Sequence, residues 1–167
     1  MRIFALSLAI FAVANFAAAA TCPLREIKPN GNFLRFGGYV IELKNLDQGD
    51  GDSGNPPVWP DGMSITPPEG KECSVPIAII EAPFFLAGSH TLYVDTYSGS
   101  EDTQFLVDVR NCGIIWSSPQ YVGPPTFLSP DRFTYEVTNI AWGDSKNQSF
   151  TVKIGRDCLP GKPVFTP

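Results

Sequence analysis

The sequence contains a single histidine, His90, and this scarcity narrows the catalytic chemistry that is open to the protein. A Ser-His-Asp mechanism would have to use His90, which follows Ser89 at the start of a strand-like run. The chain also lacks the Gly-x-Ser-x-Gly segment that exposes the nucleophilic serine of many hydrolases. We therefore interpret His90 as a turn residue and expect no enzymatic activity.

Closely spaced cysteines are also lacking, although the chain has four of them: Cys22, Cys73, Cys112 and Cys158. Their wide spacing excludes a C-x-x-C redox motif and leaves a structural zinc site without close-spaced ligands. An even number of cysteines in an exported chain predicts two disulfides, and hence no free thiolate for cysteine catalysis. Of the three possible pairings we expect Cys22–Cys73 and Cys112–Cys158, each stabilising the fold by roughly 2–5 kcal/mol.

Only one long apolar run occurs, and it stands at the start of the sequence. Arg2 precedes a largely apolar stretch that continues to Ala14, and three alanines precede a predicted cut after Ala20. This pattern is typical of a secretory signal peptide, so we assign residues 1–20 to one. A lipidated Cys22 is the alternative, but Thr21 fits poorly at the position where a lipoprotein has a smaller residue.

Basic residues are in the minority in the remaining domain, residues 21–167. Without Arg2 it holds 11 basic and 17 acidic residues, a net charge of −6. We therefore expect no nucleic-acid partner and no anionic lipid partner, whereas a basic protein surface is a favourable one. No further apolar run approaches the roughly 20 residues that span a bilayer. The length suffices for one domain with a hydrophobic core.

Apolar residues at helical spacing are absent, and alternation with a period of two takes their place. The alternating runs are Tyr39–Lys44, Thr91–Tyr97, Gln104–Arg110, Phe133–Thr138 and Ser149–Ile154, with shorter apolar runs at Ile77–Glu81 and Ile114–Trp116. Short connections between consecutive runs predict antiparallel meanders. The fold is predicted to be all-β and stapled by two disulfides, with a sandwich and a partial propeller-like arrangement both open.

Residues 45–73 break this pattern and are expected to form a long acidic loop rich in glycine and proline. A loop of this length inside a compact domain is usually functional or disordered. Asp50, Asp52 and Asp61 resemble part of a calcium loop, but a glycine stands where a further oxygen ligand is needed. A solvated acidic loop is the favoured interpretation, and we expect no metal site and no cofactor.

Aromatic residues and the calcium-like segment point to a second hypothesis, a secreted carbohydrate-binding or calcium-stabilised adhesion module. Aromatic side chains on a β surface can stack on sugars or anchor a protein interface, although most are expected in the core. The residues concerned are Trp59, Trp116, Tyr121 and Trp142. Separately, the segment Asn147-Gln148-Ser149 matches a glycosylation sequon, which matters only in a eukaryotic secretory pathway. Most acidic residues lie in turns, where solvation explains them better than the paired carboxylates of a glycosidase.

A short polar segment separates the two runs around residue 100, and its composition alone explains it as a five-residue hairpin loop. It follows Tyr97 and consists of Ser98, Gly99, Ser100, Glu101 and Asp102. Cys112 stands downstream of it, an acidic proline-rich loop leads to Cys73, and Cys158 comes late in the chain. With these landmarks, the sequence resembles the periplasmic immunity proteins that protect bacteria from type VI-secreted peptidoglycan amidases of the papain-like cysteine class.

The resemblance implies a non-enzymatic, propeller-like β domain that binds its cognate amidase in the periplasm and plugs the active-site groove. Ser98, Gly99 and Ser100 would form the tip that contacts the catalytic Cys–His pair. Tyr97, Glu101 and Asp102 would flank this tip as further partner-binding residues.

Overall fold

The computed structural model describes residues 22–45, 58–99, 101–129, 131–138 and 147–166. Regular structure in these segments is entirely β, in three antiparallel sheets, which confirms the predicted fold class. Within the same segments, no helix is long and apolar enough to cross a membrane. The expected signal peptide, the calcium candidates Asp50 and Asp52, Ser100 and Trp142 lie outside the described residues.

Each sheet consists mainly of consecutive strands, as the predicted meanders require. The first sheet contains, in spatial order, β2 (Phe33–Phe36), β3 (Tyr39–Leu43), β5 (Met63–Thr66) and β6 (Cys73–Val75). The central sheet contains β1 (Leu24–Ile27), β7 (Ile80–Ala87), β8 (Thr91–Ser98), β9 (Glu101–Asp108) and β10 (Gly113–Ser117), and β4 (Val58–Trp59) pairs with β7. The third sheet contains β11 (Val122–Ser129), β12 (Arg132–Thr138), β13 (Asn147–Lys153) and β14 (Val164–Thr166).

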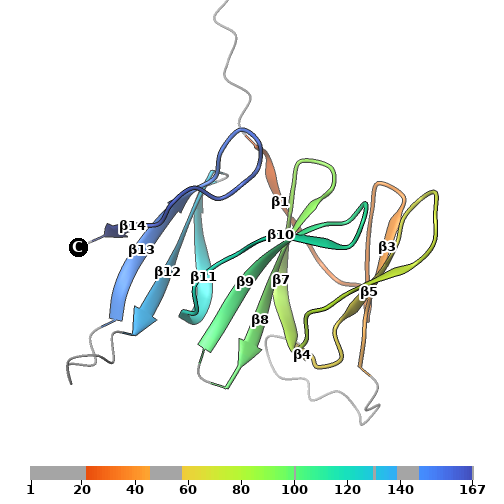
Figure 1. Ribbon diagram of the computed structural model, residues 1–167, viewed down its shortest axis with the longest axis horizontal. Helices are drawn as coiled ribbons and strands as arrows, with labels where there is room; N and C mark the ends of the chain where they lie inside the picture. The colour runs from red at the N-terminus through yellow and green to blue at the C-terminus, as the bar shows by residue number, and fades with distance from the viewer. Residues whose placement is uncertain (1–21, 46–57, 100, 130, 139–146, 167) are drawn as a thin grey trace, which may run out of the picture.

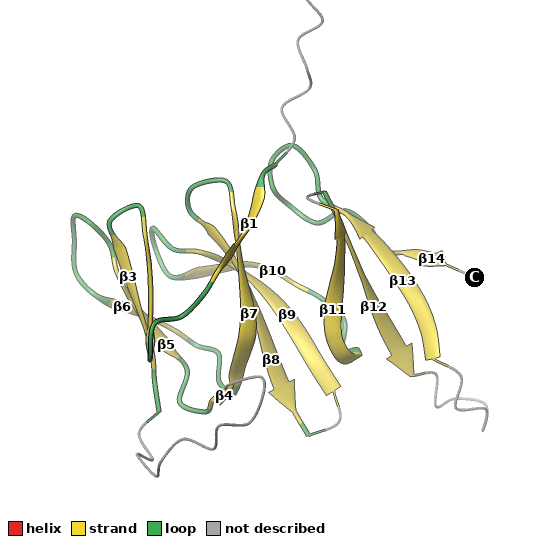
Figure 2. Cartoon of the chain, turned by 180° about the vertical axis from the view of Figure 1, so that it is seen from behind, coloured by secondary structure: helices red, strands yellow, loops and turns green. Residues whose placement is uncertain are grey.

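The three sheets lie side by side as an open fan (Figures 1 and 2). Of the two arrangements left open by the sequence, the propeller-like one therefore describes the fold better than a two-sheet sandwich. The central sheet has a core on each of its faces. Because successive strand residues point to opposite sides, neighbouring residues of one central strand enter different cores. In β8, Leu92 and Val94 join the core shared with the first sheet, whereas Tyr93 joins the core shared with the third.

Both disulfides are present, but the expected pairing is wrong. Cys22 bonds Cys158, and Cys73 bonds Cys112. Each bond joins the central sheet to one neighbour: Cys22 precedes β1 and Cys158 follows β13, while Cys73 lies in β6 and Cys112 between β9 and β10. Which strand ends meet is a property of the sheet order, so cysteine spacing alone did not reveal it. Two disulfides are typical of an oxidising compartment and an exported protein.

The expected loop over residues 45–73 is shorter than predicted, because its described part contains β4, β5 and the first residue of β6. Trp59 in β4 is 4% exposed, and its indole nitrogen donates a hydrogen bond to Asn32 Oδ1 at 3.0 Å. Its ring packs against Phe84 at a centroid distance of 5.7 Å. Trp59 therefore anchors the core and presents no surface on which a sugar could stack.

Candidate functional site

The pairing of β8 with β9 extends farther toward the hairpin tip than the expected five-residue loop allows. Ser98 pairs with Glu101 and Tyr97 with Asp102, so Ser98, Glu101 and Asp102 belong to the ladder and not to a loop. Gly99 has a φ of 72°, in the left-handed region that glycine enters at low cost. Figure 1 shows this hairpin at one end of the central sheet, where β8 ends and β9 begins. The tip is therefore narrow and is held by paired strands on both sides.

The predicted partner-binding residues divide between the surface and the interior. Tyr97 is 43% exposed, Ser98 and Gly99 are exposed, and Glu101 is half-buried. Asp102, by contrast, is 4% exposed, so its predicted place on the partner-binding surface is not supported. The cause is a backbone bridge: Asp102 N donates to Tyr121 O at 2.7 Å, and Tyr121 N donates to Asp102 O at 3.0 Å.

Asp102 belongs to a polar cluster between the central and third sheets, which we call the acid cluster. Its members are Glu81, Asp95, Asp102, Gln104 and Tyr121. Strand pairing sets Glu81 opposite Asp95 and Asp95 opposite Gln104, so these side chains share one face of the central sheet. The Tyr121 hydroxyl donates a hydrogen bond to Asp95 Oδ1.

Burial is the main electrostatic influence on the acid cluster. It raises the pKa of Asp95 to about 7, and the hydrogen bond from Tyr121 partly offsets this increase. Burial also raises the pKa of Glu81 and of Asp102. Asp95 Oδ2, Asp102 Oδ1 and Gln104 Oε1 are buried and accept no hydrogen bond within the described structure. Burial in the cluster thus disfavours the ionised form of these carboxyl groups, most strongly at Asp95.

No group of His, Cys, Asp and Glu side chains among the described residues has the geometry of a metal site. Asp61, the calcium candidate within the described part, is therefore not in such a group. His90 Nδ1 lies 3.0 Å from Ser89 Oγ. The nearby Asp108 carboxylate receives hydrogen bonds from Arg110, including one of 2.6 Å from Nη2, and these hold the pKa of Asp108 below its usual range. The arrangement does not connect Ser89, His90 and Asp108 in a catalytic relay.

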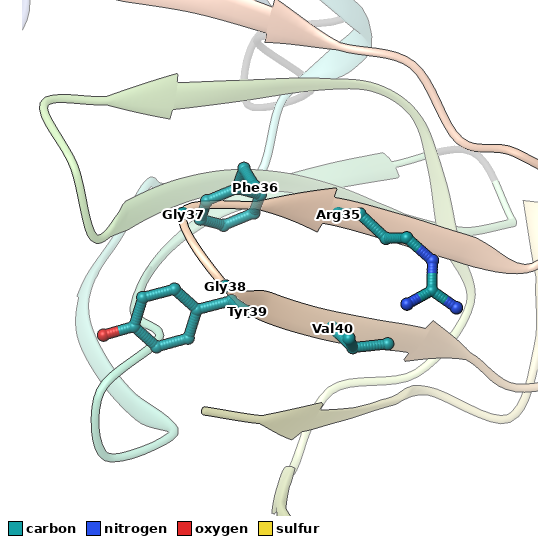
Figure 3. Close-up of a pocket in the computed structure, with 6 residues that line it drawn as sticks. All are labelled: Arg35, Phe36, Gly37, Gly38, Tyr39 and Val40. Carbon is teal, nitrogen blue, oxygen red and sulfur yellow. The ribbon is translucent and has the colours of Figure 1, made fainter. Parts of the chain in front are cut away.

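A second feature, missed from the sequence, is a shallow depression of about 450 Å³ on the β2–β3 hairpin. Figure 3 shows the Phe36 and Tyr39 rings at the turn and the Arg35 side chain farther along β2. The two rings lie 5.8 Å apart. Tyr39 also lines a neighbouring depression of about 290 Å³ with Arg110. The one available sequence signal was the Gly37-Gly38 turn, which marks the hairpin and not its surface.

The other predicted aromatic residues contribute to packing between the sheets. Tyr121 is 1% exposed, and Trp116 is half-buried against Phe133, with ring centroids 6.4 Å apart. The acid cluster itself was missed, although Asp95 between Tyr93 and Tyr97 on one face of β8 was a usable signal. No known protein family, curated protein or solved structure matches this chain.

Proposed function

We propose that this protein is a non-enzymatic periplasmic inhibitor that occludes the active-site groove of a type VI-secreted peptidoglycan amidase with its β8–β9 hairpin tip. The observation that supports it best is the exposed Ser98-Gly99 segment at the end of two long paired strands. Together with the cysteine framework, this tip is the feature that resembles the amidase immunity proteins.

The shape of the tip suits a narrow protease-like groove. Such a groove admits only a thin element with small side chains, and Ser98 and Gly99 meet that requirement. The pairing from Thr91–Asp108 to Ser98–Glu101 orders the hairpin before it meets a partner, so little conformational entropy is lost on binding. The serine hydroxyls can hydrogen-bond the polar catalytic groups, while the turn presents no extended peptide for cleavage.

Charge and compartment are consistent with this role. The net charge of −6 after signal-peptide removal favours rapid encounter with a basic enzyme, and enzymes that act on anionic peptidoglycan are often basic. Two disulfides suit the oxidising periplasm.

The tip assignment predicts that Ser98→Arg abolishes inhibition of a purified papain-like peptidoglycan amidase. The long charged side chain would block entry into the groove, whereas the exposed position lets the fold accept it. Peptidoglycan hydrolysis measures inhibition, calorimetric titration measures affinity, and thermal unfolding should match wild type. Ser74→Arg, an exposed strand position in the first sheet, is the matched control and should inhibit normally. Full inhibition and wild-type affinity in Ser98→Arg would overturn the assignment.

A further inference from the structure

Three exposed apolar side chains lie beside the tip and form a surface that we call the shoulder. They are Val58 (42% exposed), Ile79 (38%) and Tyr97 (43%). Backbone contacts bring their segments together: Tyr97 N donates to Ile79 O at 2.9 Å, and Ile79 N donates to Pro60 O at 3.2 Å. Val58 in β4 pairs with Glu81 at the same end of β7. Segments that are distant in the sequence thus converge where the hairpin tip begins.

Ile79 has a backbone conformation that its side chain disfavours. Its φ is 54°, in the left-handed region, where a residue branched at Cβ is an outlier. The other non-glycine residues with positive φ in the described segments are Cys112 and Cys158, and disulfides constrain both. Ile79 has no such constraint and still presents an apolar side chain to solvent. Residues held in strained conformations concentrate at functional sites, which makes Ile79 the most informative member of the shoulder.

The surroundings of the shoulder indicate the chemistry of its partner. The nearest carboxylates in the strand pairing are Glu81, opposite Val58, Asp102, opposite Tyr97, and Glu101, opposite Ser98. Asp102 is buried, whereas Glu81 and Glu101 are partly exposed. An apolar centre beside carboxylates complements a protein surface that has an apolar centre and lysine or arginine at its rim. Because the shoulder adjoins the tip, it would contact the edge of the groove that the tip enters.

We infer that the shoulder is a second contact of the inhibitor, in which Ile79 packs against an apolar lip of the amidase groove that basic residues surround. This inference rests on the proposed function and adds a hydrophobic anchor to the tip. Ile79 lies one position before β7 and combines this left-handed backbone with an exposed side chain.

The test compares Ile79→Ala with Ile79→Gly, which both remove the apolar side chain. Each should weaken binding to a purified papain-like peptidoglycan amidase by about 10-fold or more, measured by calorimetric titration. The glycine variant should melt about 2–4 °C above the alanine variant, because only glycine relieves the left-handed backbone. Val164→Ala, at a 65% exposed position in β14, is the matched control and should bind like wild type.

The outcomes separate this inference from the proposed function. Wild-type affinity in both Ile79 variants would overturn the shoulder contact, and the tip would stand if Ser98→Arg still failed to bind. If the wild-type protein binds no member of a panel of such amidases, the proposed function and the shoulder contact both fail. A glycine variant that melts below the alanine variant would contradict the strain at Ile79.

Discussion

At Asp95 the fold places a carboxyl group that is 2% exposed, and none of the described basic residues offsets its charge. The folded-state pKa of about 7 lies above the usual value of 3.8. Between these two values the folded protein retains a proton that the unfolded chain has released. The associated stability is therefore fully present below about pH 4 and is lost as the pH rises through 7. The raised pKa values of Glu81 and Asp102 act in the same direction.

The free energy of unfolding should accordingly fall between pH 4 and pH 8, and Asp95→Asn should flatten this dependence. The amide cannot ionise and keeps an acceptor for the Tyr121 hydroxyl. We expect it to raise stability at pH 8 by on the order of 2–4 kcal/mol. Urea unfolding at a series of pH values measures the effect.

A second variant at the same contact gives the opposite result. Tyr121→Phe removes the hydrogen bond that lowers the pKa of Asp95, so this pKa should rise further. The fall in the free energy of unfolding with pH should then continue to a higher pH than in wild type. Parallel pH profiles for wild type and Asp95→Asn would rule out this account of the cluster.

At the scale of the strand, several alternating runs of the sequence correspond closely to strands of the structure. The run Thr91–Tyr97 became β8 almost unchanged, because each of its faces packs against a core. The strand β11 was missed, since Pro124 and Pro125 argue against a strand. They are accommodated at an irregularity in the pairing between Val122 and Thr126, which only the neighbouring β12 reveals.

The candidate site was predictable only where it depends on local sequence. Turn composition located Gly99 in the turn correctly, because a flexible residue is favoured there, whereas Ser98 is the last residue of β8. The length of the turn was not predictable, since Glu101 joins the ladder through its pairing with Ser98. The burial of Asp102 follows from its bridge to Tyr121, a contact between sheets that period-two alternation cannot indicate. The strain at Ile79 likewise has no signature in the sequence.

The third sheet is attached to the central one through aromatic rings, and Phe133 in β12 is the most buried of them. It lies at 0% exposure, with ring centroids 5.4 Å from Phe127, 6.1 Å from Tyr93 and 6.4 Å from Trp116. Phe133→Ala should cost about 3–5 kcal/mol, because it removes these contacts and leaves a cavity. Chemical denaturation would measure the change.

Phe165→Ala is the comparison for Phe133→Ala, because Phe165 is 53% exposed in β14 and contacts only the Phe150 ring among the described aromatic pairs. Its cost should stay below about 1 kcal/mol. Equal costs for the two variants would show that the ring cluster does not hold the sheets together.

Over the whole molecule, composition and alternation predicted the β class, but the number of sheets and the disulfide pairing depend on contacts between distant segments. The two bonds enclose very different loops, with sequence separations of 39 for Cys73–Cys112 and 136 for Cys22–Cys158. Because cross-links restrict the unfolded chain more as the loop lengthens, they should contribute about 4 and about 5 kcal/mol respectively.

Paired substitutions test these contributions. Cys22→Ser with Cys158→Ser should lower the melting temperature more than Cys73→Ser with Cys112→Ser, as measured by calorimetry. Both double variants should be measured in the same buffer and at the same scan rate, so that the difference in melting temperature reflects the disulfides alone. Peptide mapping of the unreduced protein would contradict the structure if it recovered a Cys22–Cys73 fragment.

The Cys22–Cys158 bond also governs how the fold responds to mechanical force. When the two ends of the chain are pulled apart, the force between Cys22 and Cys158 passes through the disulfide. The strands between these cysteines, from β1 to β13, therefore carry almost none of the load. The strand β14, Val164–Thr166, lies beyond Cys158 and outside the protected stretch. Under tension, β14 would peel from β13 first, while the tip and the shoulder keep their arrangement.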